Sequence, residues 1–230
     1  MHRLKSRARR TIVQEIIVLI GAPGAGKGTQ GQLLSEAFSL PLVSTGSILR
    51  EIAKDNTPFG HQIRNVMSAG ELASDEILAS IIRQRTSEED CRHGYILDGH
   101  PRSCSHAEWL DNWSKEQRKK LVAIFLDVPY EEIHRRLSGR RICRNCNKVF
   151  NTHLKSFEDQ RSCDLCGGKL TSRPDDTPLV IDRRLKVFEK ATAPLVQFYK
   201  QKNQLVVIDG RGSAEDVFRR LFKGLSRRAS

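Results

Sequence analysis

Five short apolar runs alternate along the chain with segments in which apolar residues recur at helical spacing. The runs lie at residues 16–20, 42–43, 95–98, 121–127 and 205–209. Between them, apolar positions three and four residues apart predict helices over residues 32–38, 61–69, 74–82, 130–137, 178–201 and 214–225. Strands that alternate with helices favour a parallel sheet covered on both faces. The pattern therefore predicts an α/β fold built on a five-stranded parallel sheet flanked by helices.

Breaks in the helical pattern mark a small insertion between the second and third strands. Ser44 or Thr45 is placed to cap a helix, and residues 57–60 interrupt the pattern before the next helix. We therefore expect residues 44–73 to form a small helical insertion. In the long helix farther along the chain, Pro194 is expected to cause a kink or a break, because proline has no backbone N–H to donate.

A glycine-rich stretch follows the first strand and precedes the first helix. Residues 21–30 read GAPGAGKGTQ, and Gly28 stands where the general G-x-x-x-x-G-K-[ST] motif has serine or threonine. Glycines let successive backbone N–H groups turn toward an anion, and the helix N-terminus adds partial positive charge. Lys27 is placed to reach the outer phosphates of a nucleotide. The nucleotide-binding residues expected here are Gly24, Ala25, Gly26, Lys27, Gly28 and Thr29.

A carboxylate ends the third strand, near the place where a ligand is expected. In parallel α/β sheets, ligands bind beyond the carboxyl ends of the strands, so Asp98 shares an edge with the glycine-rich stretch. Mg²⁺ prefers oxygen ligands and keeps much of its hydration shell, so Asp98 is suited to hold it through water. An aspartate at a strand end can equally cap the following turn, and position alone does not separate the two.

Four of the six cysteines form two pairs. Cys143 and Cys146, followed by Cys163 and Cys166, give the spacing C-x₂-C-x₁₆-C-x₂-C, which is typical of a four-thiolate zinc site. Four thiolates fill a tetrahedral shell, so such a zinc ion is structural and stabilises a loop-rich segment too small for its own core. Two disulfides or redox pairs are the alternative. The segment from residue 142 to residue 170 is expected to contain loops and short strands.

The composition fits a globular protein whose basic excess lies at its two ends. The chain has 230 residues, of which 38% are hydrophobic and 29% charged, and its formal net charge is +12. Residues 1–10 and residues 219–230 each carry five basic residues and no acidic one, so the rest of the chain is near balance. Such tails are typically solvated. Weak binding to RNA or an anionic surface, an organelle transit peptide and a mis-chosen start codon are alternatives.

Membrane segments are not expected from the apolar pattern. No apolar run approaches the roughly 20 residues of a bilayer-spanning helix, and the basic start is followed by only a short apolar strand and then glycines, unlike a secretory signal. We therefore expect no membrane partner and a cytoplasmic location.

Several motifs together resemble the adenylate kinases, within the nucleoside monophosphate kinase family, from about residue 15 to residue 222. They comprise the glycine-rich stretch, STG…LR at residues 44–50, DG…PR at 98–102, GRR at 139–141, RPDD at 173–176, RL at 184–185 and DG at 209–210. The resemblance implies a P-loop kinase fold and reversible phosphoryl transfer from Mg·ATP to AMP, which yields two ADP. Zinc-bearing lids of the layout seen here occur in many bacterial members of the family.

The resemblance also implies roles for individual residues. The residues expected to act in catalysis are Lys27, Asp98, Arg102, Arg136, Arg140, Arg173 and Arg184. The residues expected on the monophosphate side are Thr45, Arg50, Gly99, Arg102 and His106. Phosphoryl transfer depends on positioning and on neutralising spread negative charge, so a lysine, a metal and several guanidinium groups suit it without a nucleophilic side chain.

Three residues depart from the family pattern. Ser47 stands where an aspartate is common, His100 where an aromatic residue is common, and His106 where a glutamine usually reads the adenine of AMP. A histidine ring can donate or accept hydrogen bonds according to its tautomer, so adenine recognition can survive or shift to another base. A kinase for a different nucleoside monophosphate is therefore the alternative hypothesis.

A second alternative is a zinc-ribbon nucleic-acid-binding protein that kept a nucleotide site. The four cysteines and basic tails motivate it. Aromatic residues make up only 6% of the chain, and the cysteine segment has no cluster of aromatic and basic residues for base stacking. We therefore expect nucleic acid to bind weakly, if at all, through the tails.

The expected domain organisation is a single kinase domain with two insertions. The core takes residues 15–43, 74–141 and 174–224, between a basic tail at 1–14 and another at 225–230. Residues 142–173 are expected to form the lid that closes over ATP, and the resemblance suggests a monomer.

Overall fold

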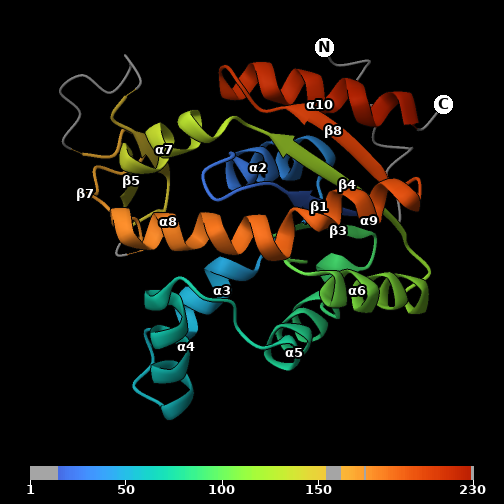
Figure 1. Cartoon of the computed structure of the whole chain (residues 1–230), viewed down its shortest axis with the longest axis horizontal. Coiled ribbons are helices and arrows are strands. Elements are labelled where there is room, and N and C mark those ends of the chain that lie inside the picture. The colour runs from blue at the N-terminus through green and yellow to red at the C-terminus, as the bar shows by residue number, and fades with distance from the viewer. Residues whose placement is uncertain (1–14, 154–161, 174, 229–230) are drawn as a thin grey trace.

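The computed structural model describes residues 15–153, 162–173 and 175–228, and a twisted sheet lies at the centre of this part of the chain (Figure 1). Across the described residues the sheet has five parallel strands in the order β2-β3-β1-β4-β8. The strands are β1 (Glu15–Ile20), β2 (Leu42–Ser44), β3 (Gly94–Asp98), β4 (Lys120–Asp127) and β8 (Leu205–Asp209). The predicted α/β fold built on a five-stranded parallel sheet is confirmed.

Helices cover both faces of this sheet. They are α2 (Lys27–Phe38), α3 (Thr45–Ile52), α4 (Pro58–Ala69), α5 (Asp75–Thr86), α6 (Cys104–Glu116), α7 (Tyr130–Ser138), α8 (Pro178–Val187), α9 (Pro194–Gln201) and α10 (Ala214–Arg228), with a 3-10 turn at Glu89–Cys91. Alternate side chains of β1 enter opposite cores. Ile17 packs with residues of α2, α7, α8 and α10, whereas Val18 packs with residues of α5, α6 and α9. The central strand is thus buried on both sides, as its continuous apolar run predicts.

The insertion between β2 and β3 has a small core of its own. Leu49 of α3, Ile63 of α4 and Leu78 of α5 pack together, and α3 and α4 extend away from the sheet (Figure 1). The expected break between two helices is present, at residues 53–57, but the second helix begins at Pro58 and not at residue 61. Thr57 caps α4 by accepting a hydrogen bond from the N–H of Gly60 at 3.0 Å. Pro58 is the first residue of α4, where proline is well tolerated.

Helix α6 is the element that the apolar pattern does not predict. Its buried positions include Ala107, Leu110 and Ser114, which lie on one helical face although one of them is polar. Ser103 caps its start by accepting a hydrogen bond from the N–H of His106 at 3.3 Å. The helix carries the turn after β3 toward the second core.

The long helix breaks as Pro194 predicts. Helix α8 passes into a π-helical turn, η3 (Phe188–Thr192), in which the N–H of Ala193 bonds the carbonyl of Phe188 at 2.8 Å. Helix α9 then begins at the proline, where no backbone donor is needed.

The described part of the cysteine segment contains short strands and loops, as expected, and its strands form a small antiparallel sheet. In the described part of this segment the strand order is β6-β5-β7, with β5 at Arg140–Cys143, β6 at Val149–Asn151 and β7 at Leu170–Thr171. This sheet lies beside α7 and at the start of α8 (Figure 1). Among the described residues, no helix combines the length and apolarity needed to cross a membrane.

Candidate active site

The glycine-rich stretch turns from β1 into α2 and leaves the helix N-terminus without a side-chain cap. Gly26 is the N-cap residue and has a left-handed backbone conformation, with φ at 98°. Gly24 has φ at 85°, and a Cβ placed there would lie 2.8 Å from Cγ of Leu137 on α7. The free N–H groups of the first turn of α2 therefore face a loop that only glycine can form, which is a favourable place for phosphate.

Lys27 folds back over this loop. Its Nζ donates hydrogen bonds to the carbonyls of Gly21 at 2.8 Å and Ala22 at 2.9 Å. Burial lowers the pKa of Lys27 to about 8, with a smaller contribution from the neighbouring cation of Arg102 and against the opposing effect of Asp98. The negative charge of a phosphate would favour the protonated form of this lysine, and the protonated lysine would in turn bind the phosphate.

Asp98 lies beside the N-terminus of α2. Its carboxylate accepts a hydrogen bond from the hydroxyl of Ser44 at 3.5 Å, and a Cβ on Gly28 would lie 3.5 Å from Oδ2. Within the described residues this carboxylate accepts no hydrogen bond from the backbone of the following turn, which disfavours the capping alternative. A carboxylate with free lone pairs next to a phosphate loop suits the hydrated Mg²⁺ that accompanies ATP.

A cavity between the helical insertion and the core gathers most residues expected on the monophosphate side. Its lining comprises Thr45, Gly46, Leu49, Arg50, Ile63, Val66, Met67, Gly70, Glu71, Leu72, Ala73, Leu78, Gly99, Arg102, Asp175 and Arg184. Gly99 has φ at 87°, and a Cβ there would lie 2.6 Å from Oγ1 of Thr45. The apolar wall and the guanidinium groups suit a ligand with a flat apolar part and an anionic end. We call this space the acceptor cavity.

A second cavity continues from the acceptor cavity to the glycine-rich loop. It is lined by Gly21, Pro23 and Lys27 of that loop, together with Gly99, Arg102 and Arg184, which also line the acceptor cavity. Arg102 and Arg184 thus lie where the two spaces meet. Two anionic ligands, one at each end, would both face these guanidinium groups.

Buried arginines surround this meeting point. Arg184 binds Asp175 at 3.0 Å and Asp176 at 3.2 Å, and Asp176 also binds Arg140. Burial and the neighbouring cations of Arg140 and Arg50 lower the pKa of Arg173 to about 10, and its buried Nε has no hydrogen-bond partner among the described residues. The cluster therefore has positive charge that the surrounding acids do not fully balance, which favours an anionic ligand.

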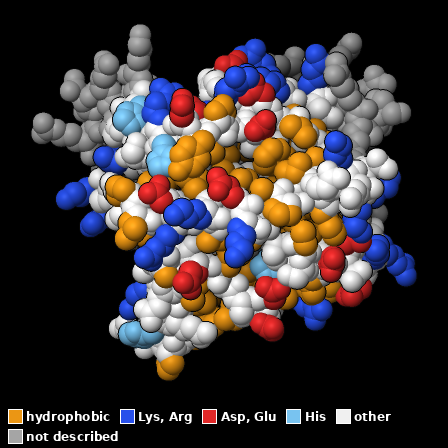
Figure 2. Space-filling model, viewed as in Figure 1, with side chains coloured by type: hydrophobic (Ala, Val, Ile, Leu, Met, Phe, Trp, Pro, Cys, Tyr) orange, Lys and Arg blue, Asp and Glu red, His pale blue; other side chains and the backbone are white. Residues whose placement is uncertain are grey.

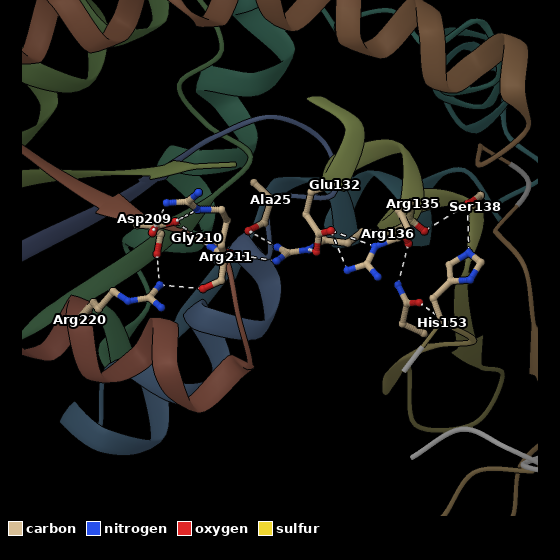
Figure 3. A network of polar contacts seen from close by, with 11 residues as sticks. Ala25, Glu132, Arg135, Arg136, Ser138, His153, Asp209, Gly210, Arg211 and Arg220 are labelled. Carbon is tan, nitrogen blue, oxygen red and sulfur yellow. Dashed lines mark hydrogen bonds and ion pairs between the residues drawn. The ribbon is translucent and has the colours of Figure 1, made fainter. Parts of the chain in front are cut away.

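Arg136 reaches the glycine-rich loop from α7 (Figure 3). Glu132, one turn earlier, accepts from its Nε at 2.9 Å, and the carbonyls of Gly210 and Ala25 accept from its two other nitrogens at 2.9 and 3.5 Å. The i,i+4 spacing of Glu132 and Arg136 was a signal that the sequence analysis missed. In Figure 3 the chain of contacts continues on one side to Asp209 and Arg211, and on the other to Ser138 and His153.

The four paired cysteines converge at the tip of the small sheet. Their Sγ atoms all lie within 4.8 Å of one another, with 3.4 Å between Cys143 and Cys166 and 3.5 Å between Cys146 and Cys163. A tetrahedral zinc ion with Zn–S bonds of about 2.3 Å needs sulfurs roughly 3.8 Å apart, whereas a disulfide needs about 2.0 Å. Backbone N–H groups, that of Cys146 above all, lower the pKa of Cys143 to about 6, so this one of the four thiols favours the thiolate form that a metal binds. The cluster fits zinc and is far from disulfide geometry.

Comparison with known proteins decides the family. A family model described as adenylate kinase matches residues 19–204. An adenylate kinase of Clostridium tetani is 42% identical over 203 residues, which cover 88% of this chain and 94% of that protein. Adenylate kinases of Caldicellulosiruptor bescii and Thermodesulfovibrio yellowstonii are 42% identical over 210 residues and 39% over 203, covering 91% and 88% of this chain and 98% and 94% of theirs. The chain belongs to the adenylate kinase family.

In this adenylate kinase, the structure brings together most residues that the sequence singled out. Lys27, Asp98, Thr45, Arg50, Gly99, Arg102, Arg140, Arg173 and Arg184 surround the two connected cavities or lie within the charge network that reaches them. His106 differs, because it lies behind the turn that carries Arg102 and does not line the acceptor cavity. Its partner Asp75 was not anticipated. The individual roles of all these residues stay predictions.

Proposed function

We propose that this adenylate kinase transfers the terminal phosphoryl group of Mg·ATP reversibly to AMP, giving two ADP. The observation that carries the proposal is the continuity of the two cavities at Arg102 and Arg184. A triphosphate bound at the glycine-rich loop and a monophosphate in the acceptor cavity would present their phosphates to the same guanidinium groups. Family membership supports this reaction.

The donor end is built to hold a triphosphate. The N–H groups of the glycine-rich loop and of the first turn of α2 bind its oxygens, and Lys27 exchanges its two carbonyl partners for phosphate. Arg136 crosses the loop and adds a second cation. Asp98 would hold the Mg²⁺ that accompanies ATP, and this ion would neutralise part of the phosphate charge.

The acceptor end orients the attacking phosphate. Thr45, Arg50 and Arg102 line the cavity where an AMP phosphate would lie, and its apolar wall covers the base. Arg140, Arg173 and Arg184 stabilise charge on the phosphoryl group during transfer, because guanidinium forks match its oxygens. No side chain of the protein is bonded to phosphorus in this scheme.

We propose that residues 142–173, of which 154–161 lie outside the described residues, act as a lid over ATP, and that the four cysteines would hold a structural zinc ion. A closed metal shell fixes the short strands of this segment and leaves catalysis to the arginines. Closure excludes water, which strengthens the charge interactions with the phosphoryl group. We further propose a monomer in the cytoplasm, because the two cavities are built from one chain and unpaired thiols persist in a reducing compartment.

Two alternatives have specific motivations. His106 in place of the usual glutamine motivates a kinase for a different monophosphate, which an acceptor panel tests directly. The four cysteines motivate nucleic-acid binding, but basic and acidic side chains are interspersed on the face seen in Figure 2 and form no continuous basic surface there. The expected C-terminal tail is wrong in part, because α10 runs to Arg228 and buries Leu221 and Leu225 in the core. Deleting residues 1–10 and replacing the exposed Arg219 and Lys223 with glutamine should abolish any salt-sensitive RNA binding.

Substitution of Arg102 tests the proposed function. With Mg·ATP and AMP, Arg102→Ala should lower kcat/KM by at least about a hundredfold, because a charge-assisted contact made in the transition state is lost. Arg92→Ala is the matched control, since this arginine is exposed and pairs only with Glu89 among the described residues. Equal activity of both variants would contradict the proposal.

A further inference from the structure

His106 is buried behind the acceptor cavity, and both nitrogens of its ring are already bonded within the chain. The N–H of Arg102 donates to Nδ1 at 3.3 Å, and Nε2 lies 2.6 Å from Oδ1 of Asp75. A neutral imidazole carries one proton. Because Nδ1 accepts, Nε2 carries the proton and donates it to the carboxylate. No hydrogen-bonding atom of the ring remains for a nucleobase.

The carboxylate of Asp75, which His106 contacts, is itself held in place. Asp75 is the first residue of α5, directly after the helical insertion, and its second carboxylate oxygen accepts a hydrogen bond from Ser105 at 2.8 Å. The hydrogen bond from Ser105 holds the pKa of Asp75 below its usual range, so the carboxylate stays an acceptor. The start of α5 is thereby attached to α6 at two points.

The other end of the contact is the backbone of Arg102. Its N–H is held by His106, and its carbonyl accepts a hydrogen bond from Oγ1 of Thr192 at 2.8 Å. Its Nε donates to the carbonyl of Gly99 at 2.8 Å, which sends the guanidinium toward both cavities. The direction of this guanidinium therefore depends on main-chain contacts made by two buried side chains.

His100 restrains the ring from the other side. Its ring stacks on that of His106 with centroids 4.9 Å apart, and it meets Trp109 edge-on at 5.8 Å. Neither nitrogen of His100 has a hydrogen-bond partner among the described residues, and it is almost fully buried. His100 thus acts here as an aromatic packing residue, which leaves its neighbour a single orientation.

We propose that His106 is a positioning residue that ties the turn carrying Arg102 to the first turn of α5, and that it does not read the acceptor base. Through this link the helical insertion and the acceptor-phosphate site share one anchor at Asp75. The consequence for catalysis rests on the proposed function, whereas the link itself does not. Loss of the link should weaken binding of the acceptor phosphate whatever base is attached.

Two variants separate the two halves of the link. In His106→Asn the side-chain oxygen occupies the Nδ1 position and can still accept from Arg102, but it cannot reach Asp75. In His106→Gln the longer amide reaches Asp75 but leaves the N–H of Arg102 without its acceptor. Hydrogen exchange of the Arg102 amide in the ligand-free protein should be about five- to tenfold faster in His106→Gln and near wild type in His106→Asn. Unchanged exchange in His106→Gln would overturn the link.

Kinetics test what the link does. Asp75→Ala should raise KM for AMP about fivefold and leave KM for Mg·ATP within twofold of wild type. Its side chain is 57% exposed, so its removal leaves no cavity, and Glu76→Ala is the matched control on the same helix turn. In the His106→Ala background, Asp75→Ala should raise KM for AMP by less than it does in the wild-type protein, since the contact between the two residues is already lost and only the hydrogen bond from Ser105 remains to be removed.

Base preference distinguishes positioning from reading. The ratio of kcat/KM for AMP to that for IMP should stay within about twofold of wild type in His106→Asn, His106→Gln and Asp75→Ala, because a lost base contact would change it by at least about tenfold. A tenfold change in this ratio would overturn the proposal. Absence of transfer to AMP by the wild-type protein would contradict the proposed function instead, and the exchange measurement would still decide the link.

Discussion

The carboxylate of Asp176 binds the guanidinium groups of both Arg140 and Arg184. Arg140 opens the first strand of the cysteine segment, whereas Asp176 follows the end of that segment and Arg184 lies on α8. Only 2% of the Asp176 side chain is exposed. One buried carboxylate thus joins both ends of the cysteine segment to α8, on the side of the acceptor cavity.

Removal of this carboxylate should destabilise the protein. Asp176→Ala leaves the partly buried guanidinium group of Arg140 without its carboxylate partner and removes one of the two carboxylates that Arg184 binds, which costs about 3–5 kcal/mol in the free energy of unfolding. Urea denaturation followed by circular dichroism measures the change. Asp182→Ala on α8 is the control, because this aspartate is half exposed. A decrease of less than about 1 kcal/mol in the free energy of unfolding of Asp176→Ala would show that the ion pairs of Asp176 do not stabilise the base of the cysteine segment.

Removal of Arg173 should lower activity without lowering stability. Burial and neighbouring cations disfavour its charge in the free protein, since they lower its pKa to about 10. Arg173→Met should therefore leave the midpoint of thermal unfolding unchanged or raise it, while kcat falls at least about a hundredfold because the transition-state charge loses a donor. A lowered melting temperature with unchanged kcat would make Arg173 a structural residue.

The lowered pKa of Lys27 predicts a basic limb in the activity profile. The free protein loses the proton of Lys27 as pH rises through about 8, so kcat/KM for Mg·ATP should decline above that pH. The unfolded chain keeps the proton up to the ordinary value of 10.5, and between these two pH values it binds more protons than the native state. The contribution of Lys27 to stability therefore rises with pH across this window. In Lys27→Met this increase of stability with pH should disappear. If the variant kept the increase, another titrating group would be its cause.

Zinc removal should unfold the lid and leave the core sheet intact. Metal analysis should find about one zinc ion per chain, lost in the Cys143→Ser, Cys163→Ser double variant, with a lower melting temperature and reduced activity. Cys104→Ser is the control, because Cys104 lies on α6 away from the cluster. A metal-free protein with unchanged thermal stability would contradict the structural role.

Local sequence patterns predicted most helices and strands. Which side chains contact one another across the fold could be seen only in the tertiary structure. The apolar run of β1 and the spacing of the four cysteines can each be recognised within a short stretch of sequence. The contact between Asp75 and His106 spans 31 residues and that of Arg140 with Asp176 spans 36, so neither leaves a local signal. Helix α6 was missed for a related reason. Its buried face includes polar residues that only the packed core makes compatible with burial.

The same distinction separates the residues of the site. The glycine-rich loop is specified by its own backbone requirements, and its residues are where the sequence predicts them. His106 was expected to face the acceptor because its position in the sequence matches a base-reading residue. In the structure its ring turns toward Asp75, because a buried imidazole is stabilised most where both nitrogens have partners.

An acceptor panel tests the central claim most directly. Initial rates are measured with Mg·ATP and each of AMP, GMP, CMP, UMP and dAMP, and products are quantified by chromatography. We predict that AMP is the preferred acceptor by at least about tenfold in kcat/KM and that two ADP form for each AMP consumed. A different preferred base would reassign the kinase, and no turnover with any of the five monophosphates would contradict phosphoryl transfer itself.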